Sequence, residues 1–245
     1  MSNSSLVTYT KKSPNYTKLS GKKNTHIVIH HMAGKLTVQQ CGQIFANPAR
    51  QASSNYGVQD KNVGLYVDES NRSWATSNRE IDSKAVTIET SNSTLGPDWK
   101  VSEESINTLI KLCADICKRN GIKELKYTGD KSGNLHLHQW YSATGCPGPY
   151  LKSKMKYIAA QVNNKLKKPA TVSKTKYKVI EEGGMNVRES YNTSSKIKGL
   201  AEYGKTYVAT KSHTNTDGTL WVYFSGKKGW VCYKGKKKTY LKKMN

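Results

Sequence analysis

The chain has 245 residues, of which 40 are Lys or Arg and 17 are Asp or Glu, so its formal net charge is +23 at pH 7. Such a length accommodates one domain of ordinary size and a small one. The basic excess predicts a polyanionic partner: nucleic acid, an anionic membrane surface or an acidic cell-wall polymer. The sequence has no apolar run of about 18 residues, which excludes a membrane-spanning helix and membrane insertion as its mode of action.

Cysteine usage and the first residues indicate where the protein is made. The five cysteines are odd in number and irregularly spaced, which argues against a disulfide framework. Cys113 and Cys117 lie four residues apart in a helical pattern and are expected to be core thiols. Residues 1–5 lack a basic region followed by an apolar run, so no cleaved signal peptide is expected. We therefore expect synthesis in a reducing cytoplasm.

Strand and helix patterns alternate through residues 1–164. Strands are expected at 25–31, 56–58, 64–67 and 85–90. Helices are expected from the cap Thr37 to Asn47, after Ser102 as far as Gly121, and from about Tyr150 to Asn164. The inward face of the first helix is expected to carry Val38, Cys41, Ile44 and Phe45. Strands interspersed with helices predict an α/β domain, with a mixed central sheet flanked by helices.

The rest of the chain contains only strand and turn patterns. Residues 165–175 are Lys-rich and include one Pro, a composition typical of an exposed linker. Residues 176–245 consist of short strand patterns separated by Gly-bearing turns. They predict a small all-β barrel that follows the α/β domain of residues 1–164.

Two of the predicted strands carry polar residues that are suited to chemistry. Side chains alternate across a strand, so His30 and Glu89 lie on the face opposite their apolar neighbours Ile29 and Ile88. The apolar face is expected to pack. His30 and Glu89 then project to the other side of the sheet.

Histidines and one cysteine form a candidate metal site. The pair His30-His31 ends the first strand, and His136, His138 and Cys146 follow far downstream. One imidazole from each segment and the thiol of Cys146 supply three borderline-soft ligands. A catalytic zinc site needs three such groups and an open fourth position. The residues alone leave open which histidine of each pair is the ligand, and whether Cys146 is a structural thiol instead.

Four separated segments resemble the type 2 N-acetylmuramoyl-L-alanine amidases, a family that includes phage endolysins, bacterial autolysins and peptidoglycan-recognition proteins. The segments are the strand ending in His30-His31, Asn55-Tyr56-Gly57, Val86–Glu89, and His138 with Cys146-Pro147-Gly148 after seven residues. They occur in the family's order over residues 20–165, and the last segment is the most specific.

The resemblance implies roles for these residues. Zinc would be held by His30, His138 and Cys146; it would activate a water molecule and polarise the scissile amide carbonyl. Glu89 looks like the general base that takes the proton of that water. Without a metal beside it, Glu89 could instead cap a strand or pair with a lysine. Tyr56 looks like the hydroxyl donor to the developing oxyanion.

Three further residues are candidates within the same resemblance. Thr144 stands where many relatives carry a lysine, two residues before the last ligand; its hydroxyl can donate a hydrogen bond but brings no positive charge. Trp74 and Trp140 are candidates to line a sugar- or peptide-binding cleft. Core packing is the alternative for both tryptophans.

The last part of the chain resembles a bacterial SH3-type (SH3b) domain over residues 176–243. The resemblance rests on segments 184–189, 194–197, 203–205, 221–223 and 229–231. Such domains in wall hydrolases typically bind peptidoglycan. The resemblance therefore implies an SH3-like barrel that tethers the enzyme to its polymer and raises its local concentration there.

The sequence thus predicts zinc-dependent hydrolysis of the amide bond between N-acetylmuramic acid and L-alanine in Gram-positive peptidoglycan. As in phage endolysins, the protein would reach the wall from the host cytoplasm through a holin-type pore. The main alternative is a non-catalytic peptidoglycan-recognition protein, against which Cys146 argues. A nucleic-acid-binding protein is supported by charge alone. An amidase that recycles soluble muropeptides would need no wall-binding domain.

Overall fold

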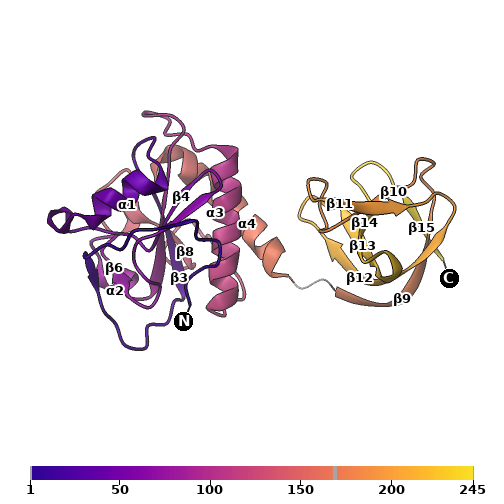
Figure 1. Ribbon diagram of the computed structural model, residues 1–245, viewed down its shortest axis with the longest axis horizontal. Helices are drawn as coiled ribbons and strands as arrows, with labels where there is room; N and C mark the ends of the chain where they lie inside the picture. The colour runs from indigo at the N-terminus through magenta and orange to yellow at the C-terminus, as the bar shows by residue number, and fades with distance from the viewer. Residues whose placement is uncertain (1, 168–169, 245) are drawn as a thin grey trace. The chain divides into compact units, whose positions relative to one another are not determined.

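The computed structural model describes residues 2–167 and 170–244. The chain divides into two compact units, Met1–Leu166 and Lys167–Asn245. The first unit combines helices with strands, whereas the described residues of the second form strands and a short 3-10 turn (Figure 1). Within the two described ranges, none of the helices combines the length and the apolarity that a bilayer crossing requires.

A six-stranded mixed sheet forms the centre of the first unit. In sheet order its strands are β1 (Tyr9–Thr10), β5 (Asn62–Leu65), β4 (Tyr56–Gln59), β7 (Ala85–Thr90), β3 (His26–His31) and β8 (Leu135–Leu137). Neighbouring strands run parallel except β4 and β5, which form an antiparallel hairpin. The predicted mixed sheet is confirmed. A separate two-stranded sheet pairs β2 (Tyr16–Thr17) with β6 (Arg72–Ser73).

The hairpin explains why β5 lies earlier than the predicted strand 64–67. Gln59 pairs with Asn62, so the chain reverses within two residues. Asp60 adopts a φ of +49°, the left-handed conformation that tight hairpin turns use. β5 therefore starts directly after the turn. Tyr66 already lies beyond the strand, where its amide donates to the carbonyl of Asn55 at 2.9 Å.

Helices cover both faces of this sheet. α3 (Glu103–Arg119) packs against α4 (Gly148–Leu166) on one side, and α1 (Val38–Ala46) and α2 (Arg79–Asp82) lie on the other (Figure 1). The helix starts follow local signals, since Thr37 and Gln40 form a capping box and the Ser102 hydroxyl caps α3. Ile44 departs from the prediction: it is 40% exposed, because α1 packs through Val38, Cys41 and Phe45 while Ile44 lines a pocket.

The main core lies between the sheet and the α3–α4 pair. It contains the apolar side chains on one face of β3, β4 and β7 together with the inward faces of both helices. Ile27, Ile29, Val86 and Ile88 are fully buried there. The opposite sheet face has smaller apolar clusters, around Val28 and Ile81 and around Phe45. The sequence expectation that Ile27 and Ile29 pack while His30 turns away is confirmed.

The second unit is all-β, as predicted. Its antiparallel sheet has the order β11 (Ile197–Ala201), β10 (Met185–Arg188), β14 (Gly229–Lys234), β13 (Leu220–Phe224), β12 (Thr206–Thr214), β9 (Ala170–Val179) and β15 (Leu241–Met244). A 3-10 turn, η3 (Ser225–Lys227), joins β13 to β14. Phe224, Val222 and Val231 lie in its core. Its assignment as an SH3-type barrel stays a prediction.

The predicted linker, residues 165–175, is shorter in the structure. Helix α4 continues to Leu166, and β9 begins at Ala170, where its first residues pair with β12. Pairing with a neighbouring strand satisfies backbone groups that a linker would leave to water. Residues 168–169 of the predicted linker lie outside the described residues.

Candidate functional site

Two parallel neighbours, β3 and β7, bring His30 and Glu89 together. The two residues are direct register partners, so both side chains leave the same face of the sheet. His30 is 1% exposed, and its Nδ1 lies 3.9 Å from Oε1 of Glu89. The strand alternation that buries Ile29 and Ile88 on one face therefore places an imidazole beside a carboxyl group on the other.

The segment after β8 adds His138 and Cys146. β8 ends at Leu137, and the 3-10 turn η2 (His138–Trp140) follows at once. The amide of Gln139 donates to the carbonyl of Cys146 at 3.0 Å, which closes the intervening loop. As a result, Nδ1 of His138 lies 3.1 Å from Nδ1 of His30. One ring nitrogen of each histidine and Sγ of Cys146 all lie within 4.8 Å of one another.

Burial sets the protonation of this cluster. Desolvation lowers the pKa of His30 well below its usual value, and the neighbouring His138 and His31 lower it further. Desolvation, followed by His31, also lowers the pKa of His138. Both imidazoles are therefore neutral near pH 7, the form that binds metals. Burial and the charge of Glu89 raise the pKa of the Cys146 thiol, which accepts a 3.4 Å hydrogen bond from the His31 amide.

The donor set fits a small, borderline-soft cation. Tetrahedral zinc with nitrogen and sulfur ligands requires ligand separations of about 3.3–3.8 Å. Here the two Nδ1 atoms lie 3.1 Å apart and the three donors lie within 4.8 Å of one another. The Ser142 hydroxyl lies 2.8 Å from Nε2 of His138, which leaves Nδ1 of that ring to face the cluster. Among the described residues, His30, His138 and Cys146 can thus hold a metal ion. The sequence left open which histidine of each pair is a ligand. The cluster contains His30 rather than His31, and His138 rather than His136.

Glu89 has the properties of a group that exchanges protons. Burial raises the pKa of its carboxyl group to about 8, against a smaller opposing effect of Arg50. Its Oε2 is buried without a hydrogen-bond partner among the described residues. A carboxyl group with a pKa near neutrality can both take up and release a proton.

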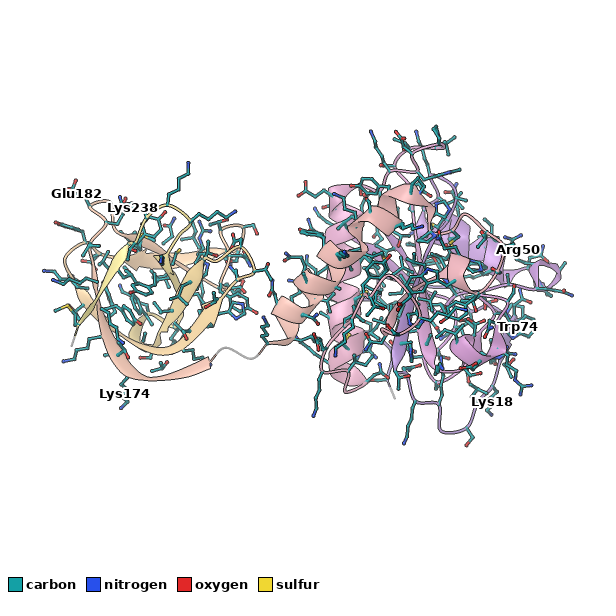
Figure 2. The ribbon with its side chains drawn as sticks, turned by 180° about the vertical axis from the view of Figure 1, so that it is seen from behind. Lys18, Arg50, Trp74, Lys174, Glu182 and Lys238 are labelled. Carbon is teal, nitrogen blue, oxygen red and sulfur yellow. The ribbon has the colours of Figure 1, made fainter. Side chains whose placement is uncertain are left out.

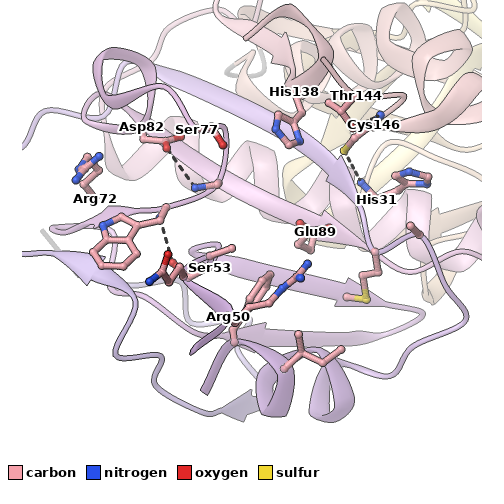
Figure 3. A pocket seen from close by; sticks show the side chains of 18 of the residues that line it. His31, Arg50, Ser53, Arg72, Ser77, Asp82, Glu89, His138, Thr144 and Cys146 are labelled. Carbon is pink, nitrogen blue, oxygen red and sulfur yellow. Dashed lines mark hydrogen bonds between the residues drawn. The ribbon is translucent and has the colours of Figure 1, made fainter. Parts of the chain in front are cut away.

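A pocket of about 850 Å³ opens over the cluster. Glu89, His138 and Cys146 line it together with Trp74 and Thr144, so both of these predicted residues reach the site (Figure 3). The indole N–H of Trp74 donates to the Thr17 hydroxyl at 2.9 Å, which fixes the ring. The Thr144 hydroxyl accepts a 3.2 Å hydrogen bond from the Cys146 amide and thus supports the loop that carries the thiol.

Tyr56 does not reach the pocket, contrary to the sequence expectation. In the sheet it pairs with Ile88 and therefore faces the apolar core between the sheet and α3. It is fully buried; its hydroxyl donates to Glu69 at 2.7 Å and accepts from the Ser4 amide at 2.9 Å. The structure assigns Tyr56 to packing and hydrogen bonding on the far face.

Trp140 is likewise not brought to the pocket. Its ring stacks on Tyr127 with centroids 5.9 Å apart and packs against the main core. His136, the alternative ligand, also lies outside the cluster: its Nε2 is 3.0 Å from the Gly133 carbonyl and its Nδ1 is 2.6 Å from the Tyr141 hydroxyl. His31 lines the pocket through a ring that contacts Trp99 edge-on, and it is not part of the cluster.

Sequence reasoning missed the arginines of the pocket, which are Arg50, Arg72 and Arg79. A compositional signal was available. Only 5 of the 40 basic residues are arginines, so each arginine in this lysine-rich chain stands out. Spacing alone could not have grouped them, because they come from a 3-10 turn, a strand and a helix.

Comparison with known proteins identifies the family. The model of the N-acetylmuramoyl-L-alanine amidase family (Amidase_2) matches residues 20–149, more than half of the chain. This stretch contains the whole candidate site. No match was found among curated protein sequences.

Two solved structures, with TM-scores of 0.52 and 0.50, share a fold with 64% of this chain. The hydrolase AmiA of Staphylococcus aureus, solved with its ligand, is 17% identical over 64% of this chain and 80% of its own, with a TM-score of 0.52. The catalytic domain of XlyA is 15% identical over 64% of this chain and 99% of its own, with a TM-score of 0.50. The N-acetylmuramoyl-L-alanine amidase LysC of Clostridium intestinale URNW is 18% identical over 58% of this chain and 89% of its own, with a TM-score of 0.45. On the family match, which spans the His-His-Cys cluster and Glu89, this chain belongs to the N-acetylmuramoyl-L-alanine amidase family.

Proposed function

We propose that the protein is a zinc-dependent hydrolase that cuts the amide bond between N-acetylmuramic acid and L-alanine in bacterial peptidoglycan. One observation carries the proposal: two neutral imidazoles and a thiol converge within 4.8 Å beside a buried carboxyl group, at the floor of an open pocket. Family membership supplies the bond class.

In this proposal, His30, His138 and Cys146 hold the zinc. The metal, when bound, supplies Lewis acidity toward the scissile carbonyl. Glu89, whose Oε1 lies 3.9 Å from the His30 ring, takes the proton of the attacking water and delivers it to the leaving amine. Ser142 holds the His138 ring through Nε2, and Thr144 holds the Cys146 loop.

The remaining pocket residues position the substrate. Trp74 (labelled in Figure 2) lines the pocket, and its fixed indole offers a flat surface on which a sugar ring or a peptide can lie. Tyr56 has no role here, since its hydroxyl is engaged by Glu69 on the other face. The positive charge that stabilises an oxyanion would instead come from a metal held by His30, His138 and Cys146.

We further propose that the second unit, as an SH3b-type domain, binds peptidoglycan of a Gram-positive wall and tethers the enzyme there. Its chain is rich in lysine, which favours an anionic polymer. A phage or prophage origin, with access to the wall through a holin-type pore, is part of the same proposal and follows from the resemblance to endolysins.

The test is a digest of purified Gram-positive peptidoglycan with wild type and Cys146→Ala side by side, followed by mass spectrometry. We expect new L-alanine amino termini with wild type and none with Cys146→Ala. The glycan chains should stay intact with both proteins. The rival function is a recognition protein that binds without cutting. Co-sedimentation of wild type with the wall, without any released product, would establish that rival.

A further inference from the structure

The pocket has an unusual basic composition. Of the 40 basic residues of the chain, 35 are lysines and 5 are arginines. No lysine of the described residues lines the pocket, whereas Arg50, Arg72 and Arg79 all do. Lysine would suffice for a general attraction to an anionic polymer. The presence of arginine instead of lysine in the pocket therefore indicates recognition of a particular anionic group.

The three arginines come from separate, fixed elements. Arg50 ends the 3-10 turn η1 (Pro48–Arg50), whose start is capped by the side chain of Asn47. Arg72 lies on β6, and Arg79 is the first residue of α2, capped by Asn78. Figure 3 shows Arg50 turned toward Glu89, and Arg72 on the side of the pocket away from Cys146. The guanidinium groups are thus distributed along the pocket.

Of these guanidinium groups, that of Arg72 donates one hydrogen bond within the protein, from Nη2 to the Thr17 hydroxyl at 2.5 Å. Arg50, Arg72 and Arg79 form no ion pair among the described residues, and Nε of Arg72 is buried without a partner. Arg119 provides the contrast: it binds the buried Glu69 at 2.6 and 2.9 Å and so serves the fold. Asp82 also lines the pocket, and its carboxylate accepts hydrogen bonds from the backbone amides of Ala75 and Thr76.

We propose that these arginines select stem peptides with free carboxylates over peptides whose carboxyl groups are amidated, and that Arg50 binds the carboxylate nearest the scissile bond. A guanidinium offers two parallel N–H donors that match a carboxylate, whereas a lysine offers a point charge. The inference rests on the proposed function, because it takes the substrate in the pocket to be the peptide.

Two soluble probes test this. They are N-acetylmuramoyl-L-alanyl-γ-D-glutamyl-L-lysine and its isoglutaminyl counterpart, which differ only in carboxylate against carboxamide at the second peptide residue. Affinity is measured calorimetrically on the zinc-loaded full chain carrying Glu89→Gln, which keeps the ligand intact, and kcat/KM is measured on wild type. We expect the carboxylate probe to bind about 10- to 100-fold more tightly, with the same ratio in kcat/KM.

Arginine variants test which residue produces the preference for the carboxylate probe. Arg50→Gln should reduce the ratio to about 3 or less, and Arg50→Lys should leave an intermediate ratio, because charge remains while the two-donor geometry is lost. Lys111→Gln, an equal charge change on α3 across the sheet, should keep the full ratio. Equal affinity for the two probes on the Glu89→Gln chain would overturn the inference. Selective binding without any cleavage by wild type would instead overturn the amidase proposal and leave the arginine inference standing.

Discussion

The two faces of the central sheet are built from the same strands and have opposite chemistry. Ile29 and Ile88 point into the core beneath α3 and α4, whereas the residues that follow them, His30 and Glu89, lie on the opposite face, where Glu89 lines the pocket. Neighbouring residues thus serve stability and reactivity separately. Because a strand alternates its side chains, a substitution on one face should affect one property and spare the other.

The largest effect is expected on the pocket face. Glu89→Gln keeps the side-chain shape but cannot accept a proton, so kcat/KM on peptidoglycan should fall about 10²- to 10⁴-fold. Zinc content, measured by mass spectrometry of the metal, should stay at that of wild type. If the variant also loses its zinc, Glu89 supports the metal site rather than the chemistry.

The core face should respond in stability instead. Ile27 lies on β3 three residues before His30 and is fully buried, so Ile27→Ala should lower the free energy of unfolding by about 2–5 kcal/mol. The helical circular dichroism signal measures this for the first unit, since the α-helices of the described residues lie there. At a temperature where the variant is folded, its kcat should match that of wild type. A large loss of kcat in the folded variant would contradict the separation of faces.

A substitution of Tyr56 tests most directly whether this residue contributes to stability or to activity. Tyr56→Phe removes a hydroxyl that bridges Ser4 and the buried Glu69, so unfolding should become easier by about 1–3 kcal/mol. Activity of the folded variant should be unchanged. Lost activity with unchanged stability would return Tyr56 to the catalytic role that the family resemblance implies.

The smallest effect is expected at Thr144. Thr144→Val keeps the volume but loses the oxygen that accepts the Cys146 amide, so kcat/KM should fall only about 2- to 10-fold. Thr144→Ser, which keeps the hydroxyl, is the matched control and should behave like wild type. A loss of about 100-fold or more in the valine variant would indicate that the hydroxyl contacts the reacting atoms.

The sequence by itself determined what depends on local periodicity. The caps Thr37 and Ser102 marked two helix starts, and alternation along residues 26–31 and 85–90 placed His30 and Glu89 opposite the apolar residues. These features follow from near-neighbour geometry, which a single sequence contains. The zinc ligand set implied by the family resemblance also matches the cluster that the structure brings together.

Only the tertiary structure decided which side of each element reaches the pocket. The register of β4 on β7 turned Tyr56 into the core, and the 3-10 turn after Leu137 separated His138 from His136. Trp140 found a stacking partner in Tyr127. Pairing register, the direction of a turn and the convergence of arginines from three elements depend on contacts between residues far apart in the chain. A local pattern does not encode such contacts, because many packings satisfy the same periodicity.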